Sequence, residues 1–444
     1  MSNENMTNSR ENILSRDFNL SSLLKFAFPT IIMMIFMGLY TIIDTIFVSR
    51  FVNTNALSSI NIVCPIINIV VGIGTMIATG SSAIIASKMG EGDYKEAREN
   101  LSLIVIFGIT IGIIISILGI IFIDKIIWSL GASEILYSYC KDYLLIILIF
   151  TPAGILQVLF QSLIVTAGHP GFGMILSISA GMMNMILDYI FIVIFNMGIK
   201  GSALGTGIGY VLPSVIGIIF FLTSKGMLYF KKPKFDINMI FKSLYNGSSE
   251  MVSQLATAIT TFLFNLVMMK LLGENGVAAI TIIIYSQFML STLFIGFSMG
   301  VSPIMSFNYG SKNHNRLKTL IKNSITFIGF ISILVFMISM FFGYRLVSVF
   351  SPAGSEVYDI ARNGFFIFPI SFLFCGFNIF SSALFTALSN GKVSAMISFL
   401  RTFCFITIGL LTLPILFGVN GVWLAVPLSE FITMFISIYF IKTI

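Results

Sequence analysis

Two acidic residues, Asp44 and Asp188, lie within long apolar stretches of the sequence. Tyr40 precedes Asp44 by four residues, and Asn184 precedes Asp188 by the same spacing. Residues four apart share a face of a helix, so each acid is expected beside a second polar group. Two carboxylates with amide and hydroxyl oxygens suit the reversible binding of either Na⁺ or a proton. The alternative is that each acid only hydrogen-bonds a neighbouring helix.

Thr206 is a further candidate, because it lies one turn into the apolar stretch 201–223. A buried threonine often bonds its own helix instead, so its role stays open. The cation-coupling set predicted from the residues is Asp44, Asn184, Asp188 and Thr206, and these oxygens make Na⁺ a possible metal ligand there.

Other polar residues are weaker candidates for a substrate path. Tyr40 faces the same way as Asp44, and Gln157 and Gln161 share a helix face that could line a central cleft. Glu250 lies at the start of an apolar stretch. It could cap the N-terminus of that helix, where a negative charge is favoured, or face the cytoplasmic vestibule and attract a cation. Pro29 removes a helix hydrogen bond, and a bend there would let ion occupancy move the helix.

Arg401 and Glu430 are also charged and lie inside apolar stretches. They either pair with each other or take part in function, and the sequence does not decide between these roles.

The amino-acid composition indicates whether water or lipid surrounds these residues. The chain has 444 residues, of which 57% are hydrophobic and 10% are charged. A soluble domain carries about 25% charged residues. The apolar stretches reach the ~20 residues that a bilayer-spanning helix needs. They lack the alternation of apolar and polar residues that marks the strands of a membrane barrel. Helices are then the structure that satisfies the backbone hydrogen bonds inside a bilayer. We expect an all-α polytopic membrane protein with twelve spans at about 23–50, 56–87, 98–123, 135–165, 171–196, 201–223, 248–272, 276–307, 318–343, 357–388, 392–417 and 420–441.

The basic residues predict the orientation of these spans. Of the 25 lysines and arginines, 18 fall on the side of the two termini and 7 on the other. Basic residues favour the cytoplasmic side of a membrane. We therefore expect a multi-pass protein of the cell membrane with both termini in the cytoplasm. This topology also explains the net charge of +7, so nucleic acid is not an expected partner.

The two halves of the sequence match at a constant offset of 220 residues. The register holds from the first span to the last, as in Thr41/Thr261, Gly80/Gly300, Gly90/Gly310, Thr166/Thr386, Gly198/Gly418 and Leu204/Leu424. Six spans per half predict two lobes related by a pseudo-two-fold axis along the membrane normal, with a central cleft between them. The expected parts are a cytoplasmic segment 1–22, an N-terminal lobe 23–223, a cytoplasmic linker 224–247 and a C-terminal lobe 248–444.

The polar set occurs in only one of the two halves. At the offset of 220, Asp44, Asn184, Asp188 and Thr206 correspond to Phe264, Cys404, Ile408 and Val426. A residue needed for the shared architecture would be expected in both halves. The asymmetry therefore indicates a cation site in the N-terminal lobe.

Several function classes are not supported by any motif. The sequence has no GxxxxGK[ST] pattern for ATP, and its two histidines, His169 and His314, fall in turns. No catalytic set is visible, so an enzyme and a bound cofactor are not expected. Transport would be driven by an ion gradient, by the membrane potential or downhill. The internal duplication makes a monomer sufficient.

With these features the chain resembles the multidrug and toxic compound extrusion (MATE) family from about residue 20 to 440. The resemblance rests on the 6+6 duplication, Pro29 and Asp44, the loop 88–93, Asn184 with Asp188, and the stretch 201–206. It implies a cation-coupled antiporter that exports organic, often cationic and amphipathic compounds and so confers drug resistance. It also implies that Asp44, Asn184, Asp188 and Thr206 surround the coupling cation. Span 7 lacks the proline often found at its start and has Ser249 instead, and spans 7 and 10 lack the mid-membrane acids of one family branch.

Two other functions remain open. A flippase for a lipid-linked oligosaccharide or lipid precursor belongs to the same superfamily, but such chains often add two spans and basic residues facing the cavity. A channel or receptor would not need the buried, asymmetric carboxylates.

Overall fold

The computed structural model describes residues 13–443, so the first twelve residues of the expected segment 1–22 lie outside the described residues. The described chain is helical throughout its regular elements. In order they are η1 (Ile13–Ser15), α1 (Leu20–Phe51), α2 (Thr54–Gly90), α3 (Tyr94–Ile121), α4 (Ile123–Ser129), α5 (Glu134–Thr166), α6 (Pro170–Asp188), η2 (Tyr189–Ile194), α7 (Ile199–Thr223), α8 (Ile237–Asn246), α9 (Ser248–Gly310), α10 (His314–Phe350), α11 (Glu356–Ile367), η3 (Phe368–Ser371), α12 (Phe372–Ala387), α13 (Gly391–Phe399), η4 (Leu400–Cys404), α14 (Phe405–Phe417) and α15 (Val419–Ile441).

Eleven of the described helical stretches are long and apolar enough to cross a membrane. The sequence predicted twelve spans, and the difference lies in α9, whose 63 residues cover the seventh and eighth expected spans. A straight helix of that length would extend about 95 Å, which is roughly three times the thickness of the hydrocarbon core. One crossing therefore cannot accommodate α9.

The contacts of α9 show that it folds back on itself. Gly247, just before α9, packs against the backbone of Met76, and Phe307 near its end packs against Gly90. Both contacts are with α2, only a few turns apart. The reversal occurs at Gly273, whose φ of 63° lies in the region that glycine adopts without a Cβ clash. Counted as two arms, α9 restores twelve crossings.

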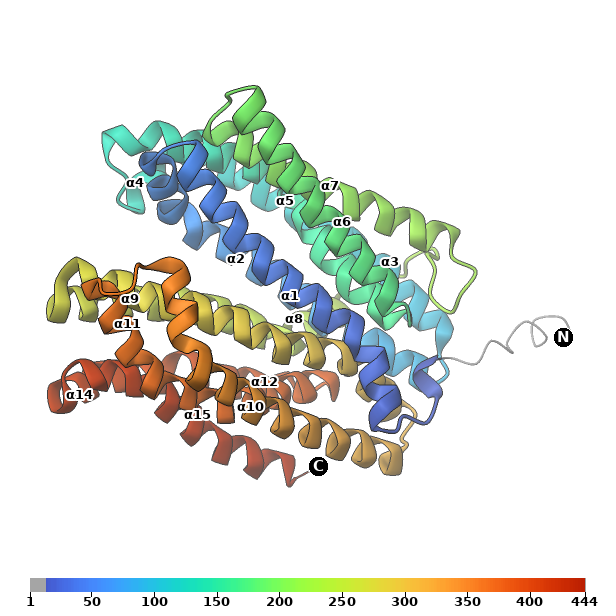
Figure 1. Cartoon of the computed structure of the whole chain (residues 1–444). Helices are drawn as coiled ribbons and strands as arrows, with labels where there is room; N and C mark the ends of the chain where they lie inside the picture. The colour runs from blue at the N-terminus through green and yellow to red at the C-terminus, as the bar shows by residue number, and fades with distance from the viewer. Residues whose placement is uncertain (1–12, 444) are drawn as a thin grey trace, which may run out of the picture.

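The element boundaries recur along the chain with the offset seen in the sequence. α2 ends at Gly90 and α9 at Gly310, and α7 begins at Ile199 as α15 does at Val419. The glycines before these last two helices have nearly the same conformation, with φ of 57° and 56°. Figure 1 shows the helices of residues 13–223, the N-half, on one side and those of residues 248–443, the C-half, on the other.

The buried cores show where the two halves meet. Figure 1 places the start of α1 and the end of α15 at one end of the molecule, which we call the terminal end, and we call the opposite end the far end. One core near the terminal end joins Leu23 and Leu101 of the N-half to Phe297 and Leu320 of the C-half. Toward the far end each half has its own core, one around Val48 and Leu144 and one around Met268 and Trp423, and among the described residues neither core includes a member of the other half.

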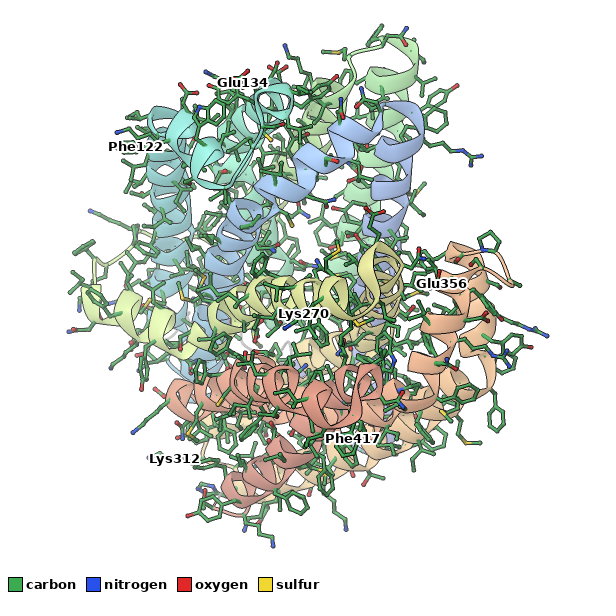
Figure 2. All side chains as sticks on the ribbon, turned by 90° about the vertical axis from the view of Figure 1, so that its left-hand side faces the viewer. Phe122, Glu134, Lys270, Lys312, Glu356 and Phe417 are labelled. Carbon is green, nitrogen blue, oxygen red and sulfur yellow. The ribbon has the colours of Figure 1, made fainter. Side chains whose placement is uncertain are left out.

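The halves are therefore closed together at the terminal end and separate at the far end. At the terminal end, the last turns of α2 and α9 touch through backbone, with Gly90 against the carbonyl of Phe307 and Gly310 against that of Ser87. Figure 2 views the far end, with Phe122 and Glu134 of the N-half opposite Glu356 and Phe417 of the C-half.

Candidate functional site

The two acids predicted from the sequence come together inside the N-half. Asp44 lies on α1, and Asp188 is the last residue of α6 before the π-helical turn η2. Because α1 packs against α6, the two carboxyl groups meet and share a hydrogen bond. Asp188 is 1% exposed. A carboxyl pair of this kind is acidic, enclosed and placed within the membrane-spanning part of the molecule.

Several buried oxygens around this pair have no hydrogen-bond partner among the described residues. They are Asp44 Oδ1, Asp188 Oδ1, Asn184 Oδ1 and Gln157 Oε1. Buried polar atoms are nearly always satisfied, and leaving one unpaired costs about 1–3 kcal/mol. Four acceptors without donors in one region form an environment suited to a small cation, a proton or water.

A hydrogen bond holds the side-chain amide of Asn184 in place. Asn184 Nδ2 donates to Thr206 Oγ1 at 3.3 Å, joining α6 to α7. The bond uses the nitrogen of Asn184 and leaves its oxygen without a partner. Thr206 therefore bonds across to the site, although the sequence alone also allowed a bond within its own helix.

A narrow cavity adjoins these groups. It has a volume of about 10 Å³, which admits about one water-sized particle. Its walls come from α1, α5, α6 and α7, and they are Met37, Tyr40, Gln157, Ser177, Ala180, Gly181, Asn184, Thr206, Gly209 and Tyr210. The cavity is thus sized for an ion or a water molecule and is too small for an organic drug.

Gly205 allows α7 to approach Asp188 closely. A Cβ at this position would collide with Asp188 Oδ1, one of the unpartnered oxygens. Any larger residue at position 205 would therefore displace the carboxyl group. The glycine stands one residue before Thr206, so the same turn of α7 provides both the space and a polar ligand.

Three tyrosines surround the acids, and two of them were missed from the sequence. Tyr40, Tyr143 and Tyr210 are close enough to Asp44 to interact with it electrostatically. Tyr210 follows Thr206 by four residues on α7, and this spacing could have identified it. Tyr143 gave no such signal, because only the packing of α5 on α2 and α7 brings it near the acids.

No basic side chain neutralises the pair among the described residues. The ion pairs found there involve other acids, and none includes Asp44 or Asp188. Asp124, outside the spans, shows the contrast: Lys141 Nζ lies 2.8 Å from its carboxylate, and the bonds from Lys141 and Tyr137 hold the pKa of Asp124 below its usual range. The buried pair has no such basic partner among the described residues.

A family model described as MatE matches residues 29–190 and again residues 251–411. The chain belongs to the MATE family. The match falls once in each half, with the Asp44–Asp188 pair inside the first copy only. The chain is thus a multi-pass membrane transporter and not an enzyme.

Named relatives agree with this assignment. Multidrug export protein MepA of Staphylococcus aureus (strain bovine RF122 / ET3-1) is 25% identical over 425 residues, covering 92% of this chain and 90% of its own. MepA of Staphylococcus haemolyticus (strain JCSC1435) is 24% identical over 428 residues, covering 95% and 93%.

Solved MATE structures share the fold of this transporter. A MATE protein in the straight conformation superposes with a TM-score of 0.92 at 19% identity, covering 98% of each chain. The outward-facing form of a multidrug resistance MATE transporter of the MOP superfamily gives 0.91 at 20% identity, covering 97% of each chain.

The other candidate residues that the sequence predicted for this MATE transporter do not all lie at the cavity. Gln157 lines the cavity, whereas Gln161 donates from Nε2 to the sulfur of Met37 at 3.0 Å and does not line it. Pro29 lies inside α1, which continues as a helix on both sides of it, so it does not end the helix. Glu250 belongs to the C-half and lies near Arg401 rather than near the acids.

The C-half contains a salt bridge at the corresponding place. Arg401 Nε lies 2.6 Å from Glu430 Oε1, and Asn378 Nδ2 donates to the other oxygen at 2.8 Å. At the offset of 220, Arg401 and Glu430 correspond to Gly181 and Tyr210, which both line the N-half cavity. A fixed guanidinium thus occupies in the C-half a region that the N-half leaves to a small cavity.

The donor set also limits the kind of ion. No group of three or more His, Cys, Asp or Glu side chains that could hold a metal occurs among the described residues. The site offers two carboxylates and neutral oxygens, and among the described residues it lacks the thiolate and imidazole ligands that softer transition metals prefer.

Proposed function

We propose that this MATE transporter is a secondary active multidrug exporter. It exchanges organic, often cationic and amphipathic compounds for Na⁺ or H⁺ across the cell membrane. The observation that carries the proposal is the buried Asp44–Asp188 pair, which has unpartnered oxygens and no fixed basic partner among the described residues. Relatives named multidrug export proteins support the same activity.

The chemistry of exchange follows from charge. Two carboxylates in contact inside a low-dielectric region repel each other strongly unless a cation or a proton neutralises one of them. A Na⁺ ion would be held by Asp44, Asp188, Asn184 and Thr206, and a proton would be shared by the two carboxyl groups. A cationic drug approaching the same half competes for the same negative charge, so drug and ion alternate rather than bind together.

Movement of the halves completes the cycle. The form described here is closed at the terminal end and separated at the far end, and the proposed orientation places the terminal end and both chain termini in the cytoplasm. It is therefore the form that releases drug outside and takes up the coupling cation. Ion binding next to α1 changes the position of this helix around Pro29, and the two lobes, residues 23–223 and 248–444, rock to open inward.

Glu250 has a separate part in this scheme. Its side chain is partly buried at the start of α9, and no hydrogen bond or ion pair to it is recorded among the described residues. We assign it to the vestibule, where its charge attracts cationic compounds before they reach the N-half. No feature of the site favours a lipid-precursor flippase, since Arg401 is held by Glu430 and does not face the cavity as a free cation.

The test replaces each acid by its amide. Asp44→Asn and Asp188→Asn keep the size of the side chain but remove the charge, so we expect normal amounts of folded protein and loss of drug export. Export is measured in proteoliposomes with an imposed Na⁺ or pH gradient, which also identifies the coupling ion. Asp359→Asn, an exposed acid of α11, serves as the matched control and should export normally. Wild-type export by either amide variant would refute the coupling role of the pair.

A further inference from the structure

The helix that joins the two halves has an exposed apolar face. On α8, Ile237, Phe241 and Tyr245 are 53%, 63% and 58% exposed. At about 100° per residue, their four-residue spacing places them within an arc of roughly 80°. The opposite side of α8 is buried against the protein through Met239, Ile240, Ser243 and Asn246. The helix therefore has a second apolar face that no described part of the chain covers.

Exposed lysines lie directly beside this face. Lys231, Lys232 and Lys234 precede α8, and Lys242 lies on it. None of the four lies within ion-pair distance of an acid among residues 13–443. The neighbouring acid, Asp236, is engaged at the start of α8, where it accepts hydrogen bonds from two backbone amides at 2.9 and 3.2 Å. The surface therefore combines an apolar arc with unpaired positive charge.

This surface is held in a fixed position by the protein. The backbone amide of Lys231 donates to Ser102 Oγ at 3.0 Å, and Arg98 Nε donates to the carbonyl of Met227 at 2.8 Å. Both bonds dock the linker on α3. The linker follows the end of α7 at Thr223 and precedes α9 at Ser248, so it lies at the level where two spans leave the membrane.

We propose that this linker surface, residues 231–245, binds anionic phospholipids of the membrane leaflet at the terminal end. Ile237, Phe241 and Tyr245 enter the boundary between headgroups and acyl chains, and the lysines contact the lipid phosphates. A helix with an apolar face flanked by basic residues lies in the membrane interface in this way. Anionic headgroups complement the four unpaired ammonium groups, and the apolar arc needs the acyl boundary that a soluble acidic partner does not offer.

Lipid binding here acts on both halves of the molecule. Asn246 Nδ2 donates to the carbonyl of Thr386 in the C-half at 2.9 Å. On the other side, Gly80 of α2 in the N-half packs directly on the carbonyl of Ser243. A lipid that holds α8 in place therefore stabilises the closed terminal end described here.

The affinity test uses the purified full-length protein in detergent, with phosphatidylglycerol or phosphatidylcholine added. We expect phosphatidylglycerol, but not phosphatidylcholine, to raise the thermal unfolding midpoint. The triple variant Lys231→Gln, Lys232→Gln, Lys234→Gln should bind phosphatidylglycerol about 100-fold more weakly, because each lysine near a lipid surface contributes about a fivefold change in affinity. The matched control removes three exposed lysines at the same end, Lys312→Gln, Lys318→Gln and Lys322→Gln, and should keep the full effect.

The depth test asks whether the apolar arc enters lipid. A spin label at Tyr245→Cys, with the four native cysteines replaced by alanine, should be more accessible to oxygen than to a water-soluble nickel reagent in phosphatidylglycerol-containing nanodiscs. Equal loss of the lipid effect in both lysine triples would overturn the proposal. So would stabilisation by inorganic phosphate alone, or a label at position 245 that stays in water as it would under a soluble acidic protein.

Discussion

At the scale of single residues, the N-half site depends on what each side chain leaves unpaired. Asn184 uses its amide nitrogen on Thr206, and its oxygen is left over together with one oxygen of each acid. Gly205 provides the room in which Asp188 Oδ1 lies. The bonding pattern of the polar residues thus leaves these oxygens unpartnered among the described residues, and a glycine provides the space beside them.

Gly205→Ala tests the space made for Asp188. The added methyl group overlaps Asp188 Oδ1 and pushes the carboxyl group away from Asp44, so we expect the apparent affinity for the coupling ion to fall about tenfold, equal to about 1.4 kcal/mol. The dependence of drug export on ion concentration measures this change. Gly329→Ala is the control, because a Cβ there meets nothing within 4 Å. An unchanged ion dependence in Gly205→Ala would mean that the position of Asp188 Oδ1 does not matter for coupling.

At the scale of elements, each half has a π-helical turn at or next to one of its charged residues inside the spans. In the N-half η2 follows Asp188, and in the C-half η4 begins at Leu400 and includes Arg401. The guanidinium of Arg401 reaches Glu430 on α15, and Asn378 on α12 completes the bonding of that carboxylate. This cluster ties three elements of the C-half together with its charges internally balanced.

Breaking the Arg401–Glu430 pair should destabilise the C-half. Glu430 is 2% exposed, and removal of one partner from a buried ion pair costs about 3–5 kcal/mol because the other charge is left unpaired. We expect Arg401→Met and Glu430→Gln each to lower the thermal midpoint in detergent. The double variant Arg401→Met, Glu430→Gln should recover most of the loss, since no unpaired charge remains. A double variant as unstable as the sum of both single variants would show that the pair is not coupled.

At the scale of the whole molecule, a close backbone contact holds the two halves together at the terminal end. The backbone contact between the ends of α2 and α9 requires glycine on both sides, at Gly90 and Gly310. A side chain at either position would force the two helices apart. Since the shared core near the terminal end includes Ala86, one turn before Gly90 on α2, this core would open with them.

Gly90→Val should shift the protein toward the form that is open at the terminal end. The measurement is the reactivity of a single cysteine, Ala86→Cys, with a water-soluble thiol reagent in a background free of the four native cysteines. Ala86 is 0% exposed, so we expect little reaction in the parent and about tenfold faster reaction with Gly90→Val, which corresponds to a population shift of about 1.4 kcal/mol. The same substitution at Gly329, which meets nothing nearby, should leave the cysteine protected. Protection that persists in Gly90→Val would contradict the role of this contact.

The sequence by itself determined the all-helical membrane fold, the approximate spans and the two acids. These features depend on local properties, because apolar length sets a span and a charge in an apolar stretch is visible without any neighbour. Even the reversal at Gly273 followed from length: the backbone leaves the helical conformation at this glycine, so α9 consists of the two helical arms that the sequence expected.

Only the tertiary structure decided which polar groups face each other. Tyr143 comes near Asp44 through the packing of α5 on α2 and α7, Gln157 lines the cavity while Gln161 bonds Met37, and Arg401 is neutralised by a residue 29 positions away. Such contacts depend on how helices rotate and cross, and helix periodicity within one segment carries no information about its neighbour. For the same reason, closure at one end and separation at the other became evident only from the cores that the two halves share or keep apart.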